Sequence, residues 1–227
     1  SADSVVGVFT SQGSTATSED SDGVVGFNTW AIMVSGEARA LTTDDVHMAA
    51  VISPDARTVY HARSSGRQIA DAIDPPGVVE RLDIATGAVD VLANLPGIVD
   101  IAISADGRRL AVAHSFTPPE GATERDGATV LDLETGRVTD TITAPADIPE
   151  DIYSEINSVS LSPDGTKIAY TLAAEKELYS LERTLRVRDL TTDNDSILYT
   201  PDGGSISDIA WSVDSRSIIV QMSIREP

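Results

Sequence analysis

Short runs of apolar residues alternate with polar corners along most of this chain. The clearest corner is the Ser-Pro-Asp-Gly sequence at residues 162–165, which separates apolar runs at 156–161 and 168–172. Proline presets φ in such a corner, aspartate bonds the backbone, and glycine accepts a positive φ, so the chain reverses between two strands. The pattern therefore predicts antiparallel strands joined by tight turns. The one stretch of helical composition, residues 173–183, is short and is expected to lie in a loop.

The same corner recurs at a nearly constant spacing. Its aspartates are Asp55, Asp106, Asp164 and Asp214, which lie 51, 58 and 50 residues apart. A second turn signal begins at Asp83, Asp132 and Asp189, which follow the first three aspartates by 28, 26 and 25 residues. Two turn signals at a near-constant offset are the mark of a repeat architecture. The residues expected to build the first kind of turn are Asp55, Asp106, Gly107, Asp164, Gly165 and Asp214.

Each repeat is expected to form a four-stranded antiparallel meander, which is the blade of an all-β propeller. The expected boundaries are a partial blade at 1–45, blades at 46–95, 96–144 and 145–203, and a partial blade at 204–227. The chain is thus predicted to be a single β-propeller region. A further hairpin is predicted in the first partial blade, at Ser35-Gly36.

Two of the four corners lack glycine. Ala56 and Ser215 stand where the others have Gly107 and Gly165. A residue with a Cβ atom in the left-handed region costs about 1 kcal/mol. These two turns are therefore expected to adopt another conformation.

The repeat, with Ile168-Ala169-Tyr170 after its corner and an Asp-Leu-x-Thr-Gly turn, resembles the β-propeller repeats of TolB-type proteins, relatives of the WD-repeat blades. The resemblance covers residues 46–222 and implies blades around a channel, with ligands held on one rim. It implies no catalytic residue in this chain. The expected strands do not divide evenly into a closed ring, which favours an incomplete portion of a ring of six to eight blades. The alternative is that a second copy of the chain completes the ring.

The charge of the chain is strongly negative, with 36 acidic and 16 basic residues and a formal net charge of −20. Such a surface repels nucleic-acid phosphates and anionic lipid headgroups, so neither is expected as a partner. It suits a cation or a basic protein partner, and it also suits plain solubility. No apolar run is long enough to span a membrane, and the first residues do not resemble a signal peptide. An extracellular or cell-envelope location in a bacterium is the favoured interpretation.

The sequence holds no recognised catalytic pattern. There is no cysteine, which excludes disulfides, thiol nucleophiles and cysteine-bound zinc. A nucleophile elbow, a phosphate loop and a dinucleotide fingerprint are all missing from the sequence. The histidines His47, His61 and His114 are not expected to converge on a metal. No cofactor and no metal are predicted.

The best candidate for binding is the rim on which the connections after second and fourth strands emerge. The second-to-third connections are predicted to be long, at 11–22, 63–77, 116–126 and 173–183, and long polar loops on a rigid scaffold commonly bind partners. The candidate rim residues are Asp71, Asp74, Glu120, Glu124, Arg125, Asp126, Asp147, Glu150 and Asp151.

These features favour a non-enzymatic propeller scaffold that binds a protein or peptide on its long-loop rim. One alternative is the propeller domain of a larger serine hydrolase resembling prolyl oligopeptidases. Another is a propeller that binds a small ligand or a metal on its rim.

Overall fold

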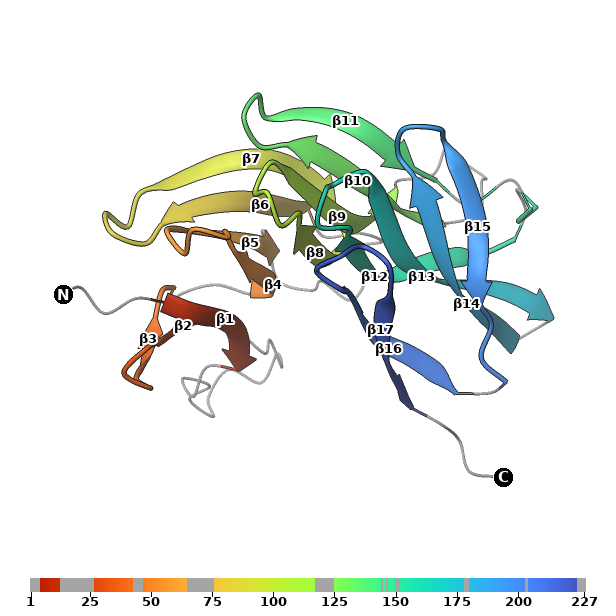
Figure 1. Cartoon of the computed structure of the whole chain (residues 1–227), viewed down its shortest axis with the longest axis horizontal. Coiled ribbons are helices and arrows are strands. Elements are labelled where there is room, and N and C mark those ends of the chain that lie inside the picture. The colour runs from red at the N-terminus through yellow and green to blue at the C-terminus, as the bar shows by residue number, and fades with distance from the viewer. Residues whose placement is uncertain are drawn as a thin grey trace. The chain divides into compact units, whose positions relative to one another are not determined.

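The computed structural model describes residues 5–12, 27–42, 47–64, 76–116 and 125–223, except for residues 144, 146, 150–151, 178–179 and 203. Within these ranges the regular elements are the strands β1 to β17, joined by turns (Figure 1). None of the described residues belongs to a helix able to cross a membrane. The chain divides into two compact units, Ser1–Ile98 and Val99–Pro227.

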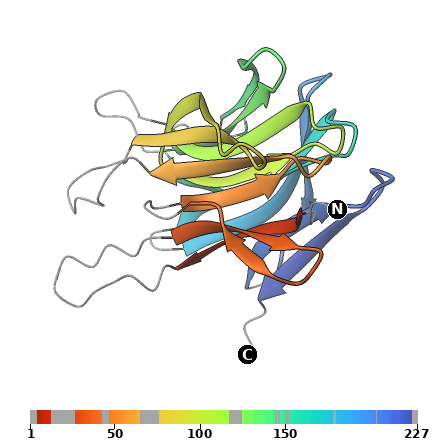
Figure 2. The same cartoon turned by 90° about the vertical axis from the view of Figure 1, so that its left-hand side faces the viewer.

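The first unit holds two antiparallel sheets. One has the strand order β1-β2-β3, and the other is a four-stranded meander with the order β4-β5-β6-β7, orange to yellow in Figure 2. The strands are β1 (Val5–Gln12), β2 (Phe27–Met33), β3 (Ala38–Ala40), β4 (His47–Ile52), β5 (Thr58–Ser64), β6 (Pro76–Asp83) and β7 (Val89–Pro96). The hairpin predicted at Ser35-Gly36 is confirmed, because it joins β2 to β3. β4 packs against β1 and β2.

The second unit repeats the four-stranded pattern. β8 to β11 form one meander, β12 to β15 form the next, and β16 pairs with β17. The strands are β8 (Ile98–Ile103), β9 (Arg109–Phe116), β10 (Arg125–Asp132), β11 (Arg137–Ile142), β12 (Ser154–Leu161), β13 (Lys167–Glu177), β14 (Ser180–Asp189), β15 (Asn194–Tyr199), β16 (Ser205–Trp211) and β17 (Ile218–Ser223). Among the described residues, one parallel bridge, Arg125 to Ser154, joins the first residues of β10 and β12.

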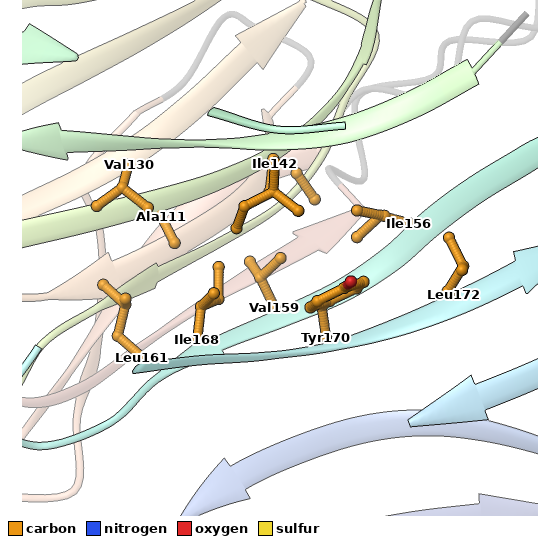
Figure 3. Packing of buried hydrophobic residues seen from close by; sticks show 11 residues of the cluster. Ala111, Val130, Ile142, Ile156, Val159, Leu161, Ile168, Tyr170 and Leu172 are labelled. Atoms are coloured by element: carbon orange, nitrogen blue, oxygen red, sulfur yellow. The ribbon is translucent and has the colours of Figure 1, made fainter. Parts of the chain in front are cut away.

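The core of this unit lies between successive sheets. Strand residues alternate between the two faces of a sheet, so every second side chain of β12 and β13 points the same way. Ile156, Ile168 and Tyr170 are fully buried in this direction and share a cluster with Ala111 and Val130 of the preceding meander (Figure 3). Burying an apolar side chain of this size stabilises the fold by about 1.5–3 kcal/mol. A second cluster covers the opposite face of the sheet and includes Ala169, Leu185, Ile206 and Ile209.

The Ser-x-Asp corners are confirmed as hairpin turns between first and second strands. In the clearest corner the Ser162 N–H donates to the carbonyl oxygen of Lys167 at 2.9 Å. The Ser162 hydroxyl donates to Asp164 Oδ1 at 2.7 Å, and the same oxygen accepts the N–H of Thr166 at 3.1 Å. The equivalent serine-to-aspartate bonds at Ser53, Ser104 and Ser212 measure 2.6, 2.6 and 2.7 Å. The four copies of the Ser-x-Asp pattern therefore fold into the same local structure.

The expectation that Ala56 and Ser215 would change the turn is wrong. Their φ values are 55° and 58°, in the same left-handed region as Gly107 at 72° and Gly165 at 67°. The serine and aspartate hydrogen bonds are kept at both corners, so the surrounding turn holds these two residues in a conformation that their Cβ atoms disfavour.

The prediction of a loop at residues 173–183 is also wrong. β13 continues to Glu177, β14 begins at Ser180, and Ala173 and Ala174 pair with Arg183 and Glu182. Both alanines are buried, so the neighbouring strands and packing override a composition that also suits a helix.

Candidate functional site

Most of the predicted rim residues lie outside the described residues, namely Asp71, Asp74, Glu120, Glu124, Glu150 and Asp151. Arg125 and Asp126 were expected in a loop, but the structure makes them the first two residues of β10, opposite Phe116 and Ser115 of β9. The prediction of a loop at these two residues is therefore wrong. Pairing with β9 extends β10 beyond the apolar run from which its start was predicted. Of the nine predicted residues, Asp147 is the one whose side chain is described.

Asp147 anchors the connection between β11 and β12 to the middle of the next sheet. Its two carboxylate oxygens accept hydrogen bonds from the two terminal nitrogens of Arg186, at 2.8 and 3.0 Å. The guanidinium beside it holds the pKa of Asp147 below its usual range. A two-pronged contact of this kind fixes orientation as well as distance. Asp147 therefore has a structural role on this rim.

Arg186 is itself part of a buried polar cluster. Its Nε donates to Asp195 Oδ1 at 2.8 Å, and the hydroxyl of Tyr170 donates to the other oxygen of Asp195. Burial opposes the charge of Arg186, but the hydrogen bonds to Asp147 and Asp195 outweigh it and raise the pKa of the guanidinium. Burial and Asp195 together raise the pKa of Tyr170, so the phenol keeps its proton. The cluster ties β13, β14, β15 and the β11–β12 connection together.

Three further carboxylates lie on the same rim, at the end of the sheet where β12 begins, β13 ends and β14 begins. They are Glu155, Glu175 and Glu182. Tyr153 donates its hydroxyl proton to Glu155 Oε2 at 2.7 Å, and Asn157 Nδ2 donates to Oε1 at 3.1 Å. The N–H of Glu175 bonds the carbonyl oxygen of Tyr153 at 3.0 Å, which fastens the connection to β13.

These three glutamates are not among the rim residues predicted from the sequence. Glu175 and Glu182 fall in the stretch interpreted as a loop, and Glu155 stands at the boundary of a predicted strand. The apolar alternation from Tyr170 to Ala174 was the one available signal that β13 continues. We call Glu155, Glu175 and Glu182 the acidic rim group. Because strands carry them, their backbone positions are fixed more firmly than those of loop residues.

Two of the three histidines, His61 and His114, have partners within their own sheets, and the side chain of His47 lies outside the described part of the chain. His61 Nε2 lies 3.0 Å from Glu80 Oε2, and Arg63 donates to the other oxygen of Glu80 at 2.9 Å. His114 Nε2 lies 2.7 Å from the hydroxyl oxygen of Thr129. In the part of the chain that the structure describes, no three histidine or carboxylate side chains are grouped so that they could hold a metal ion.

The turn aspartates are fixed by local hydrogen bonds. The serine hydroxyl is the strongest influence at Asp55, Asp164 and Asp214, where it lowers the pKa of the carboxyl. At Asp189 the Thr191 hydroxyl and the N–H groups of Thr191 and Thr192 lower the pKa to about 2. These aspartates act as acceptors within their own turns.

The sequence matches no protein-family model and no curated protein. The structure is similar to that of TolB from Acinetobacter baumannii, with a TM-score of 0.58 and 16% identity over 86% of this chain and 42% of TolB. It is similar to the β-propeller domain of the Trilobed protease from Pyrococcus furiosus, with a TM-score of 0.57 and 13% identity over 96% of this chain and 60% of that one. It also resembles the acylaminoacyl peptidase of Pyrococcus horikoshii, with a TM-score of 0.59 and 14% identity over 94% of this chain and 33% of the peptidase.

This chain therefore spans less than half the length of the TolB structure that it resembles. Identities this low reveal the fold and leave the activity open. The antiparallel four-stranded sheets and their structural neighbours together give the conclusion that the chain has a β-propeller fold, as the repeats predicted.

Proposed function

We propose that this propeller is a non-enzymatic scaffold that binds a basic protein or peptide on the rim formed by its long connections. The observation that carries the proposal is the acidic rim group, three carboxylates held on the ends of β12, β13 and β14. The formal net charge of −20 adds a long-range attraction for a positively charged partner.

Electrostatic complementarity of this kind acts mainly on the rate and selectivity of encounter. Glu155 is oriented by Tyr153 and Asn157, so part of the surface is arranged before a partner arrives. Asp147 does not belong to the proposed contact surface, because the cationic guanidinium of Arg186 already pairs with its negative charge, whereas the partners of Glu155 are neutral.

The test is a selection of random peptides displayed on phage against the intact chain, with a second round on two variants. The rim variant carries Glu175→Gln and Glu182→Gln. The control carries Glu134→Gln and Asp140→Asn, which remove the same charge from the β10–β11 turn and from β11. We expect the selected peptides to be rich in lysine and arginine, to lose binding to the rim variant and to keep it for the control.

Selected peptides without basic residues, or peptides that bind both variants equally, would contradict the proposal. Equal loss on both variants would also contradict it, because that result assigns binding to net charge and not to the rim.

A second candidate is the propeller domain of a larger serine hydrolase. The observation in its favour is the likeness to two peptidases, one of which is matched along a third of its length by nearly all of this chain. Sequencing the complete reading frame tests this candidate. A flanking domain with a Gly-x-Ser-x-Gly elbow supports it, and a reading frame without one removes it.

A further inference from the structure

Asp100 joins the first strands of two successive sheets. It lies on β8, and its carboxylate reaches β12, the first strand of the next meander, 59 residues further along the chain. Its Oδ2 accepts the N–H of Val159 at 2.9 Å and the hydroxyl proton of Ser158 at 3.1 Å. Its Oδ1 accepts the N–H of Ile101 at 2.8 Å. One carboxyl group thus supplies acceptors to two strands, and a buried backbone N–H needs such an acceptor.

The position of Asp100 recurs in the repeats. It stands four residues before the serine of its corner, and the equivalent residues of the next two sheets are Ser158 and Asp208. Asp208 likewise accepts the N–H of the residue that follows it, Ile209, at 2.8 Å. The hydrogen bond from Ser158 to Asp100 therefore connects equivalent positions of two neighbouring first strands.

The carboxyl of Asp100 is largely removed from water, yet the three groups that donate to it are neutral. Within the part of the chain that the structure describes, the charge that acts on it from a packed strand is that of Asp208 on β16, which is also negative. Burying a carboxylate without a cation is costly. Burial raises the pKa of Asp100, the hydrogen bonds oppose that rise, and Asp208 adds to it.

Asp100 therefore responds to pH in the opposite sense to the turn aspartates. A carboxyl whose pKa is raised by folding stabilises the folded state below its unfolded pKa, and this contribution is lost as the pH rises through the folded pKa. Asp164 and Asp189 in the turns have lowered pKa values, so their contributions are complete above about pH 4. A loss of contact between β8 and β12 on raising the pH further does not come from such turns.

We propose that Asp100 is a proton-dependent clasp between the meanders β8–β11 and β12–β15. As the neutral acid it keeps its contact with Val159 and Ser158 without a buried charge, because a protonated carboxyl donates one hydrogen bond and still accepts others. When it ionises, an uncompensated charge lies between the two strands, and the contact opens more often. The interface is thus tighter in mild acid than at neutral pH. This device is separate from the proposed rim surface and involves none of the acidic rim group.

The test is an NMR titration of the intact, isotope-labelled chain from acid to neutral pH. The carboxyl carbon reports the pKa of Asp100, and hydrogen exchange of the Val159 amide, corrected for its intrinsic rate, reports the contact. We expect Asp100 to titrate above the ordinary aspartate value of about 3.9. We expect the protection of the Val159 amide to fall severalfold as the pH rises through that midpoint. Asp100→Asn, which is neutral at every pH, is expected to remove this fall.

Asp208→Asn and Asp140→Asn form a matched pair, because each removes one negative charge and Asp140 lies on the outer strand β11. We expect Asp208→Asn to lower the pKa of Asp100 and Asp140→Asn to leave it unchanged. A midpoint for Asp100 at or below the ordinary value, Val159 protection that stays constant through the midpoint, or equal effects of the two variants would overturn the proposal. If Asp100→Asn fails to fold, the titration of the unmodified chain and the matched pair still decide it.

Discussion

At each Ser-x-Asp corner one residue adopts a left-handed backbone, and the cost depends on its side chain. Glycine adopts this region freely, whereas a residue with a Cβ atom is strained by about 1–2 kcal/mol. Ala56 and Ser215 accept this strain, at φ values of 55° and 58°. The serine and aspartate hydrogen bonds of the corner, which all four copies keep, are the interactions that offset it.

Replacing Gly165 with alanine is predicted to destabilise the protein by about 1 kcal/mol, the left-handed strain less the gain from a stiffer unfolded chain. The new Cβ would also lie 3.2 Å from Cδ of Arg109. The reverse change, Ala56→Gly, is predicted to leave stability unchanged or to raise it by less than about 1 kcal/mol. Urea unfolding of the variants measures both effects.

Gly7→Ala is the control, because an added Cβ there meets nothing within 4 Å and its φ is not positive. If Gly165→Ala were as stable as Gly7→Ala, the proposed role of the left-handed corner would be wrong.

The turn carboxylates predict how stability depends on pH. The pKa of Asp189 is about 2 in the folded protein, below the value of about 3.9 in an unfolded chain. Its contribution is therefore complete above about pH 4 and is lost as the pH falls towards 2. Asp189→Asn is predicted to flatten the fall in the urea midpoint across this range. Equal acid sensitivity in Asp189→Asn and the unmodified protein would contradict this assignment.

At the scale of elements, the strands beside the corners could be predicted because their signals are local. A Ser-Pro-Asp-Gly sequence between two apolar runs predicts both the turn and the strands on either side of it. The length of β13 and β14 could not be predicted in this way, because Ala173 and Ala174 are held in a strand by pairing and burial against residues distant in sequence. The Tyr170–Arg186–Asp195 cluster was missed for the same reason, and Asp147 was assigned to binding because its partner Arg186 lies 39 residues away.

The buried cluster predicts an unequal response to removing its members. Arg186→Ala leaves Asp195, whose side chain is 12% exposed, without its cation and is predicted to cost about 3 kcal/mol, the lower end of the range for broken buried ion pairs. Asp147 is half exposed, so Asp147→Asn is predicted to cost no more than about 1 kcal/mol. Denaturant unfolding measures the loss of stability in each variant. Equal losses would contradict the prediction, because they would show that the contact of Arg186 with Asp195 adds nothing to its contact with Asp147.

At the scale of the whole molecule, the spacing of the turn signals predicted the all-β fold and the succession of sheets. The rim surface could not be predicted to the same degree, because charge marks a loop as exposed without saying which carboxylates are already paired. Asp147 is bound by Arg186, and Glu175 and Glu182 stand on strand ends that composition alone assigns to a loop. The contact of Asp147 with Arg186 and the strand pairing around Glu175 and Glu182 both join residues far apart in the sequence, which a local pattern does not contain.

Peptide-resolved hydrogen exchange of the intact chain tests the repeated-sheet architecture most directly. The account predicts three maxima of protection, each over a pair of inner strands, β5 with β6, β9 with β10, and β13 with β14, because these strands are hydrogen-bonded on both sides. Rapid exchange is predicted at the turns after Asp83, Asp132 and Asp189. One continuous block of protection, or slow exchange through those turns, would contradict it.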